Sequence, residues 1–286
     1  MPIKTILLPL GEKDRDDALL DAALTTAKRF KAHLDVLHIE PDSESLLPYA
    51  TIGLSESMRE SVRDAALQQH TESTKALQQI VDKACVRNNV SIAKRGEHPS
   101  KASADWLVAS GTQTELVAQY GRLADLIIVP LPTRISPPPR TIDAVLRETG
   151  RPVLMLPTGP IDSIGDRVVI GWNGSKEAAQ AVAAARPILR EAGAVTILTT
   201  DKRQKRRPNG DDVLNYLFCH GITATVSIMD TRTRSVPESL LANARELDAD
   251  LLVMGGYSRH RLREVIMGGV TRHVLTESDI PIMMVH

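Results

Sequence analysis

The sequence predicts an α/β protein with two tandem open-sheet domains, each built on a mainly parallel five-stranded sheet. Short, continuous apolar runs alternate with longer stretches whose apolar residues recur at helical spacing. The same order of runs occurs twice, and a chain of 286 residues has room for two domains. Because strands buried on both faces are apolar throughout, the sheets are expected to be parallel and covered by helices on both sides.

Composition narrows the class of function. Lys plus Arg and Asp plus Glu are both 35, so the formal net charge is zero, and aromatic residues make up only 3%. A balanced chain does not coat a polyanion, and a sheet that reads RNA needs stacking aromatic rings. We therefore expect no nucleic-acid partner and a core of Ala, Val, Leu and Ile.

The chain has two cysteines, no apolar run long enough to span a membrane, and an N-terminus that leads directly into a strand-like run without a signal-peptide pattern. A disulfide framework is excluded, and a reducing compartment suits the composition. These features predict a cytoplasmic protein without a membrane partner.

An internal repeat sets the domain organisation. The run 124–129 (ADLIIV) recurs 125 residues later as 249–254 (ADLLVM), and 151–156 recurs 129 residues later. A breaker-rich linker separates the two copies. We predict one domain at 1–158, with an insertion at about 40–103, and a second at 166–286.

In the first copy, strands are expected at about 3–9, 33–39, 103–109, 125–130 and 152–156, and helices near 14–31, 55–88, 112–123 and 140–149. In the second copy, strands are expected at about 167–172, 194–200, 222–229, 250–255 and 281–285, and helices near 175–192, 210–219, 236–247 and 262–277. The long stretch 55–88 carries apolar residues near the 3.6 period, and Ala178, Val182 and Ala185 form an apolar stripe on 175–192. Whether the helix at 55–88 covers the sheet or extends an interface stays open.

Ligands of open parallel sheets bind beyond the carboxyl ends of the strands. After the strand at 250–255 come Gly255 and Gly256, then the basic stretch 259–263, and then Gly268 and Gly269 at the start of a helix. Glycines let a backbone approach a ligand, and free N–H groups at a helix start attract anions. The pattern is typical of a phosphate-binding loop, although glycine pairs also occur in plain turns.

The stretch Ala249–His286 resembles the C-terminal part of a universal stress protein domain. That family carries Gly, two residues, Gly, nine residues, Gly, then Ser or Thr. Gly255 and Gly268 match this pattern, whereas Ser258 and Gly269 depart from it. Ser258 is small, and Gly269 loses a hydroxyl but keeps its backbone N–H.

The segment 169–175 resembles the first strand and loop of the same family, with Asn173 where an Asp usually contacts adenine. The alternative is that Asn173 or Ser175 caps the following helix. The resemblance also brings the end of the second strand, at Thr200, to the base. It thus implies a nucleotide-binding set of Asn173, Thr200, Gly255, Ser258, Gly268, Gly269 and Val270.

The first copy is more diverged. Its loop 130–140 contains no glycine and five prolines, which lack the N–H that a phosphate needs, and Leu10 stands where the family has Asp. We predict that this copy does not bind ATP in the family's way. Arg134 and Arg140 could hold an anion, but solvated loop arginines are the expectation.

The remaining sequence features mainly exclude classes of site and enzyme. The basic run 202–207 is interpreted as a solvated loop that could lend charge near phosphates, with a nucleic-acid patch as the alternative. No closely spaced His/Cys/Asp set predicts a metal site, and no GxSxG elbow, Walker A lysine or GxGxxG motif is present. No catalytic residue is assigned, and weak ATP hydrolysis stays open.

The resemblance implies a Rossmann-like sheet of universal stress protein type, with the strands at 152–156 and 281–285 paired across a pseudo-twofold axis. The chain would then be an internal pseudo-dimer, with further homodimerisation open. The expected function is a stress-response protein that binds ATP, with Mg²⁺, in the second domain as a regulatory switch, the first domain being degenerate. A docking protein that needs no nucleotide is the alternative, and an enzyme acting on a small metabolite is a third hypothesis.

Overall fold

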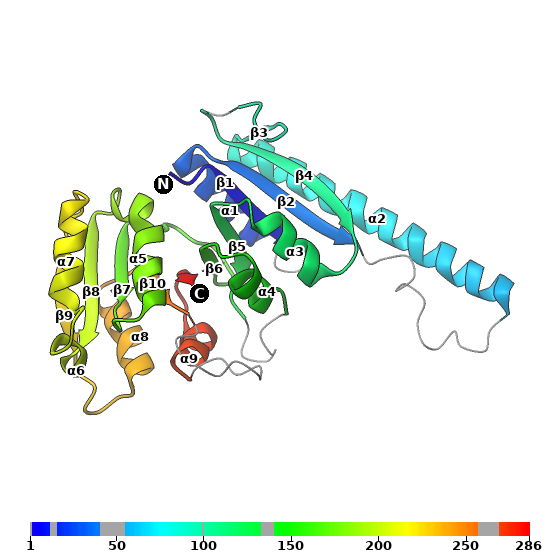
Figure 1. Ribbon diagram of the computed structural model, residues 1–286. Coiled ribbons are helices and arrows are strands. Elements are labelled where there is room, and N and C mark those ends of the chain that lie inside the picture. Colours follow the sequence, from blue (N-terminus) through cyan, green and yellow to red (C-terminus); the bar gives the residue numbers. More distant parts are fainter. Residues whose placement is uncertain (1, 12–15, 41–54, 99, 133–139, 257–268) are drawn as a thin grey trace. The chain divides into compact units, whose positions relative to one another are not determined.

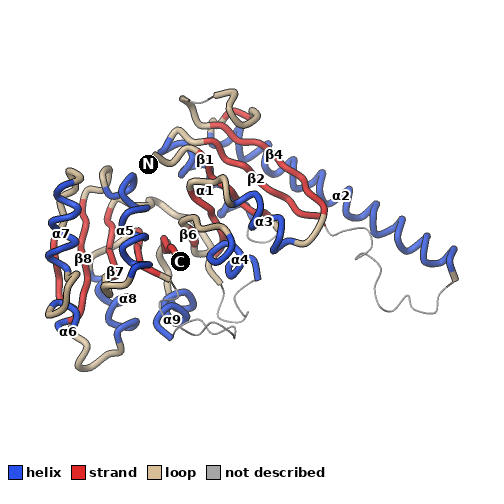
Figure 2. Tube along the Cα trace, in the orientation of Figure 1, coloured by secondary structure: helices blue, strands red, loops and turns tan. Residues whose placement is uncertain are grey.

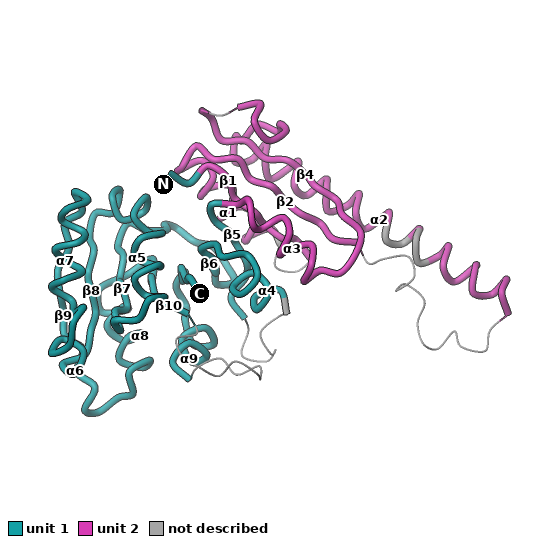
Figure 3. Tube along the Cα trace, viewed as in Figure 1, with its two compact units in different colours: residues 1–3, 125–286 teal, residues 4–124 magenta. Residues whose placement is uncertain are grey.

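The computed structural model describes residues 2–11, 16–40, 55–98, 100–132, 140–256 and 269–286. These residues form two compact units, one of residues 4–124 and one of residues 1–3 with 125–286 (Figure 3). The predicted sequence repeat does not coincide with these units, because the strands at the end of the first copy pack with the second copy. The domain boundaries 1–158 and 166–286 stay a prediction about the repeat.

The unit 4–124 contains a parallel sheet in the order β3-β4-β2-β1. Its strands are β1 (Thr5–Leu10), β2 (His33–Glu40), β3 (Ser91–Ile92) and β4 (Ser103–Ser110). Its helices are α1 (Asp16–Phe30), α2 (Glu56–Asn88) and α3 (Gln113–Gly121). Helices α1 and α2 pack together on one face and α3 covers the other (Figure 1), as right-handed connections between parallel strands require.

Helix α2 has 33 residues, about 50 Å at 1.5 Å per residue. Among its described side chains, the buried ones lie in the second half and include Leu77, Val81 and Cys85. Its first half extends beyond the strands of its own unit (Figure 2), and Met58 and Val62 are exposed there. The helix thus both covers its sheet and continues past it.

The unit containing 125–286 holds a sheet in the order β5-β6-β11-β10-β7-β8-β9. Its strands are β5 (Leu126–Pro130), β6 (Val153–Leu156), β7 (Arg167–Gly171), β8 (Ala194–Thr200), β9 (Thr225–Met229), β10 (Leu251–Gly255) and β11 (Ile282–Val285). Its helices are α4 (Arg140–Glu148), α5 (Lys176–Leu189), α6 (Asp201–Gln204), α7 (Gly210–Cys219), α8 (Val236–Glu246) and α9 (Gly269–Glu277). Helices α5 and α7 lie on one face of the second-copy strands, and α8 and α9 pack together on the other (Figure 1).

Strand pairing agrees with the predicted repeat at the ends of the two copies. Ile127 pairs with Val153 in parallel, and the equivalent residues of the second copy, Leu252 and Ile282, pair in the same way. Among the described strands of this unit, β6 and β11 form the one antiparallel pair, with Met155 opposite Ile282. The predicted α/β fold with largely parallel sheets is therefore confirmed.

Aliphatic side chains fill the core, as the low aromatic content requires. Strands β6, β10 and β11 are buried along their whole length. At the amino end of β10, Asp250 accepts hydrogen bonds from the Ser163 hydroxyl at 2.6 Å and from the backbone N–H groups of Gly165, Asp166 and Arg167. This carboxylate fastens the linker to the second copy.

The sequence-based elements agree with the structure apart from their ends and two omissions. The two-residue strand β3 and the four-residue helix α6 were not predicted, because both are shorter than any periodicity. No described helix is long and apolar enough to cross a membrane.

Candidate functional site

A cavity of about 260 Å³ opens at the carboxyl ends of strands β7, β8, β9 and β10, inside the unit containing 125–286. Four residues that the sequence assigned to a nucleotide site line it, namely Asn173, Thr200, Gly255 and Val270. They come from four separate segments of the chain, so the fold brings these four residues together. Gly269 lies next to Val270 as the first residue of α9, whereas Ser258 and Gly268 lie outside the described residues.

One part of the cavity wall is apolar. It consists of Trp172, Met229, Val236, Leu240, Met254 and Val270. The indole N–H of Trp172 donates a hydrogen bond to the carbonyl oxygen of Pro208 at 3.0 Å. This bond holds the ring in place, and the wall offers a surface for a flat, weakly polar group.

Asn173 and Ser175 organise the loop after β7. The Asn173 side-chain oxygen accepts a hydrogen bond from the Ser175 backbone N–H at 3.0 Å, and the Ser175 hydroxyl caps α5 by accepting from Ala178 at 3.1 Å. Ser175 therefore has the capping role weighed in the sequence analysis. The Asn173 amide nitrogen makes no hydrogen bond among the described residues, so Asn173 combines a turn role with a free donor at the cavity.

The two described glycines of the predicted motif, Gly255 and Gly269, differ in how much space surrounds them. A Cβ at Gly255 would lie 2.4 Å from the backbone nitrogen of Ala178 and 2.7 Å from the carbonyl carbon of Glu177. Gly255 is thus required by the close packing of α5 on β10, whether or not a ligand is bound. A Cβ at Gly269 would meet nothing within 4 Å.

The basic run after β8 supplies the site's charge. Helix α6 begins where Thr200 ends the strand, and the Thr200 hydroxyl accepts from the Arg203 backbone N–H at 3.4 Å. Lys202, Arg203 and Arg206 line the cavity. The sequence predicts a solvated loop for this run; in the structure three of its cations line the cavity, and two of these, Lys202 and Arg203, lie on helix α6, which was not predicted.

No acidic side chain lines the cavity among the residues that the structure describes. Two other cations of the run are instead paired with carboxylates. Lys205 Nζ lies 2.7 Å from Asp201 Oδ2, and Arg207 Nη1 lies 3.6 Å from Asp212 Oδ1. The cavity therefore combines an apolar wall with three cations.

The counterpart loops of the first copy are described only in part. Leu10 is buried at the end of β1, but 133–139 of the proline-rich loop, with Arg134, lie outside the described residues, as does the side chain of Arg140. The expectation that the first copy does not bind ATP stays a prediction.

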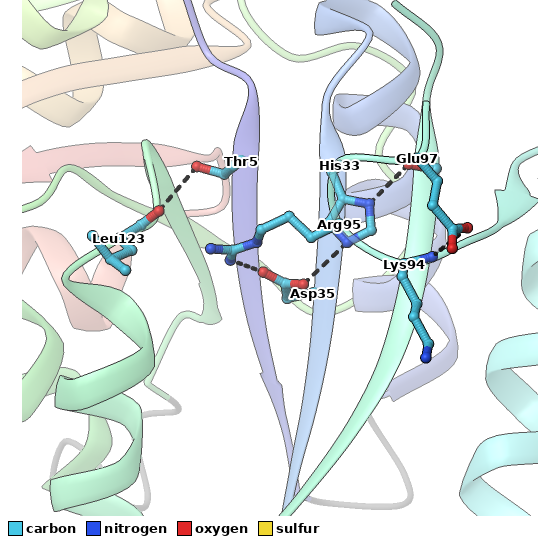
Figure 4. Close-up of polar contacts among 8 residues, drawn as sticks. Thr5, His33, Asp35, Lys94, Arg95, Glu97 and Leu123 are labelled. Carbon is cyan, nitrogen blue, oxygen red and sulfur yellow. Dashed lines mark hydrogen bonds and ion pairs between the residues drawn. The ribbon is translucent and has the colours of Figure 1, made fainter. Parts of the chain in front are cut away.

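A second polar cluster lies in the unit 4–124. Its members are His33 and Asp35 on β2, Ser103 on β4 and Arg95 in the preceding loop (Figure 4). His33 Nδ1 is 2.8 Å from the Ser103 hydroxyl oxygen, His33 Nε2 is 3.1 Å from Asp35 Oδ1, and Arg95 pairs with Asp35 Oδ2. A neutral imidazole satisfies both contacts when Nε2–H donates to Asp35 and Nδ1 accepts from Ser103.

This cluster contains the residue types of a hydrolase triad, yet its geometry is structural. Ser103 is only 1% exposed and Asp35 only 2%, so no substrate reaches the hydroxyl. Burial, followed by the positive charge of Arg95, holds the pKa of His33 below its usual value of 6.5, while Asp105 and Glu97 act in the opposite direction. We conclude that the cluster is a buried, internally satisfied network. Among the described residues, no group of three or more His, Cys, Asp or Glu side chains could hold a metal ion.

The fold and cavity define the class of open parallel α/β proteins that bind ligands at the carboxyl edge of the sheet. Comparisons with known proteins show what the chain is similar to. Residues 217–286 match the model of the universal stress protein family, which confirms the resemblance that the glycine pattern indicated.

Solved structures extend this likeness to the fold of the whole chain. A universal stress protein from Archaeoglobus fulgidus DSM 4304 aligns with a TM-score of 0.69 and 16% identity, covering 98% of this chain and 97% of that chain. A functionally unknown protein from Pseudomonas aeruginosa PAO1 aligns with a TM-score of 0.54 and 16% identity, covering 99% and 92% of the two chains. No curated protein sequence matches this chain.

Proposed function

We propose that this chain is a stress-response protein that binds ATP, with Mg²⁺, in the cavity of its second copy, and that binding acts as a regulatory switch. One observation carries the proposal: segments far apart in the sequence deliver Asn173, Thr200, Gly255 and Val270 to the same cavity. The match of residues 217–286 to the universal stress protein family supports the stress-response role.

The residues present fit the chemistry of an adenine nucleotide. The apolar wall with Trp172 and Leu240 suits the flat faces of a base, and the free amide of Asn173 can donate to a ring nitrogen. Gly269 and Val270 begin α9 as the structure describes it, and the N–H groups at the start of a helix are suited to bind an anion. The phosphate groups of ATP carry negative charge that would balance the cations lining one side of the cavity.

Binding can act as a switch only if ATP has different affinities for two states of the protein. Strand β10 and helix α9 border the cavity through Gly255 and Val270, so a ligand that contacts both residues would act on both elements. No described residue in the cavity is placed as a general base, and the proposal assigns no hydrolysis.

Calorimetric titration of the full chain with ATP and Mg²⁺ tests the proposal. We expect saturable binding at one site per chain. Val236 borders the cavity from an exposed position at the start of α8, so Val236→Trp should fill the cavity and weaken ATP binding by about tenfold or more. Leu247→Trp, at the other end of α8, is the matched control and should leave the affinity unchanged.

The docking hypothesis keeps one observation in its favour. In the first half of α2, Met58 is 56% exposed and Val62 is 37% exposed, within a helix that extends past its own sheet. If the folded protein binds no ATP, or if Val236→Trp and Leu247→Trp bind it equally well, the nucleotide proposal fails and docking through α2 becomes the favoured function.

A further inference from the structure

The cations of the basic run 202–207 differ in whether they line the cavity and in whether they form ion pairs. Lys202, Arg203 and Arg206 line the cavity, and none of them forms an ion pair with a described residue. Lys205 and Arg207 do not line it, and each faces a carboxylate, Asp201 and Asp212 respectively. In a loop that is merely solvated, ion pairing would not depend on whether a cation lines the cavity. Here the cations with a described carboxylate partner are those outside the cavity.

The segment that carries these cations is held in place by hydrogen bonds in which the three cationic side chains take no part. The Gln204 side-chain oxygen accepts from the Gly210 backbone N–H at 3.0 Å, and its amide nitrogen donates to Asp211 at 2.7 Å. The Asn209 side chain donates to the Gln204 carbonyl oxygen at 3.1 Å. Helix α6 is therefore tied to the start of α7, which positions its cations before any ligand arrives and lowers the ordering cost of binding.

Arg203 is also placed by the loop after β7. A Cβ at Gly174 would lie 3.7 Å from the Arg203 guanidinium nitrogen Nη1 and 3.3 Å from the Pro208 carbonyl oxygen. Gly174 has a φ of +72°, a conformation that favours glycine. The loop that carries Asn173 therefore runs directly beside the guanidinium.

Three like charges around one cavity repel each other and attract anions, because low-dielectric walls focus their field. Phosphate is the anion whose oxygens match both a lysine ammonium and the forked donors of arginine. A carboxylate would be satisfied by one of these cations, whereas three of them suit a phosphate or a polyphosphate.

We propose that Lys202, Arg203 and Arg206 form a phosphate subsite at the α6 side of the cavity, which takes phosphate groups of the bound nucleotide. This inference rests on the proposed function and deepens it. The family pattern in the sequence assigned the phosphates to the glycine loop after β10; the described cations assign phosphate binding to the segment after β8. The ligand class is then a nucleotide whose affinity rises with its number of phosphates.

Titration of the full chain with adenosine, AMP, ADP, ATP and inorganic tripolyphosphate tests the subsite. Affinity should increase along the nucleotide series, and tripolyphosphate alone should bind and compete with ATP. Arg203→Gln/Arg206→Gln should weaken the binding of ATP and of tripolyphosphate by about 100-fold, since each arginine would lose a charge-assisted hydrogen bond to a phosphate oxygen. Adenosine binding should change little.

The matched control is Lys205→Gln/Arg207→Gln, which removes the same charge from the same run but from residues already paired outside the cavity. It should leave both affinities within about threefold, because the long-range effect of exposed charges is screened by salt. Equal losses in the two double variants would overturn the subsite. Thermal unfolding of both variants verifies that they fold, and Lys202→Gln, at an exposed position, provides an independent single change.

The titrations distinguish failure of the phosphate subsite from failure of the proposed ATP-binding function. If wild type and Arg203→Gln/Arg206→Gln bind ATP equally, the subsite is overturned and the nucleotide function stands. If tripolyphosphate binds with the expected variant pattern but ATP binds no better than tripolyphosphate, the subsite stands and nucleotide recognition fails. If neither ligand binds, both proposals are overturned.

Discussion

Two groups of charged side chains, one in each compact unit, differ in how they are paired. Around the cavity, Lys202, Arg203 and Arg206 face space without a described carboxylate. In the cluster on β2, Asp35 is contacted by both His33 and Arg95, and Ser103 completes the network (Figure 4).

The difference follows from solvent access. A charge removed from water must be paired and hydrogen-bonded, or folding becomes unfavourable. A charge that borders an open cavity stays hydrated, so it needs no internal partner and remains available to a ligand. Pairing therefore separates a structural network from a candidate binding site more clearly than residue type does.

The largest expected effect is on the free energy of unfolding, from a substitution at Gly255. Strand β10 and helix α5 pack closely at this glycine. Gly255→Ala places a Cβ against the backbone of α5 and should lower the free energy of unfolding by about 3 kcal/mol, the upper range of overpacking. Gly269→Ala, which meets open space, should be neutral. Chemical denaturation of both variants measures this, and unchanged stability of Gly255→Ala would contradict the packing requirement at this position.

The next effect is on the buried cluster. Asp35→Ala leaves the buried Nε2–H of His33 without an acceptor and should lower the free energy of unfolding by about 2 kcal/mol. Asp248→Asn, which breaks only the exposed pair with Arg167, should cost less than about 0.5 kcal/mol. ATP affinity should be unchanged in both variants, so a weaker ligand affinity in Asp35→Ala would contradict the division into structural and binding charges.

A smaller effect depends on pH. Because the pKa of His33 is lower in the folded state than its ordinary 6.5, the unfolded chain binds more protons as the pH falls through that value. This histidine should therefore reduce stability progressively below about pH 6.5, until it is protonated in the folded state too. Denaturation curves from pH 7.5 to 5 should show a shallower loss of stability for His33→Gln than for wild type, and parallel curves would count against the neutral imidazole.

The smallest expected effect is on the stability of the cation variants. Because Arg203 and Arg206 have no described ionic partner, Arg203→Gln/Arg206→Gln should change the free energy of unfolding by less than about 0.5 kcal/mol, while ligand affinity falls. A large loss of stability in the absence of ligand would mean that these arginines have a structural role, as in the His33 cluster.

Part of the site was predictable from the sequence. Apolar runs located the strands, and the rule that ligands bind beyond their carboxyl ends pointed to the loops that follow them. The family resemblance then named Asn173, Thr200 and Gly255, which do line one cavity. The buried network was not predictable, because His33 and Ser103 are 70 residues apart and no spacing pattern links them. The cations of 202–207 were visible as a run, but their orientation was not.

The sequence by itself determined the order of strands and helices, their repetition and the family resemblance, because periodicity and turn residues act over a few neighbouring positions. Only the tertiary structure decided which arginines are paired and why Gly255 must lack a side chain. Those outcomes depend on the path of the chain after β8 and on how closely α5 approaches β10, and both are set by packing between distant segments.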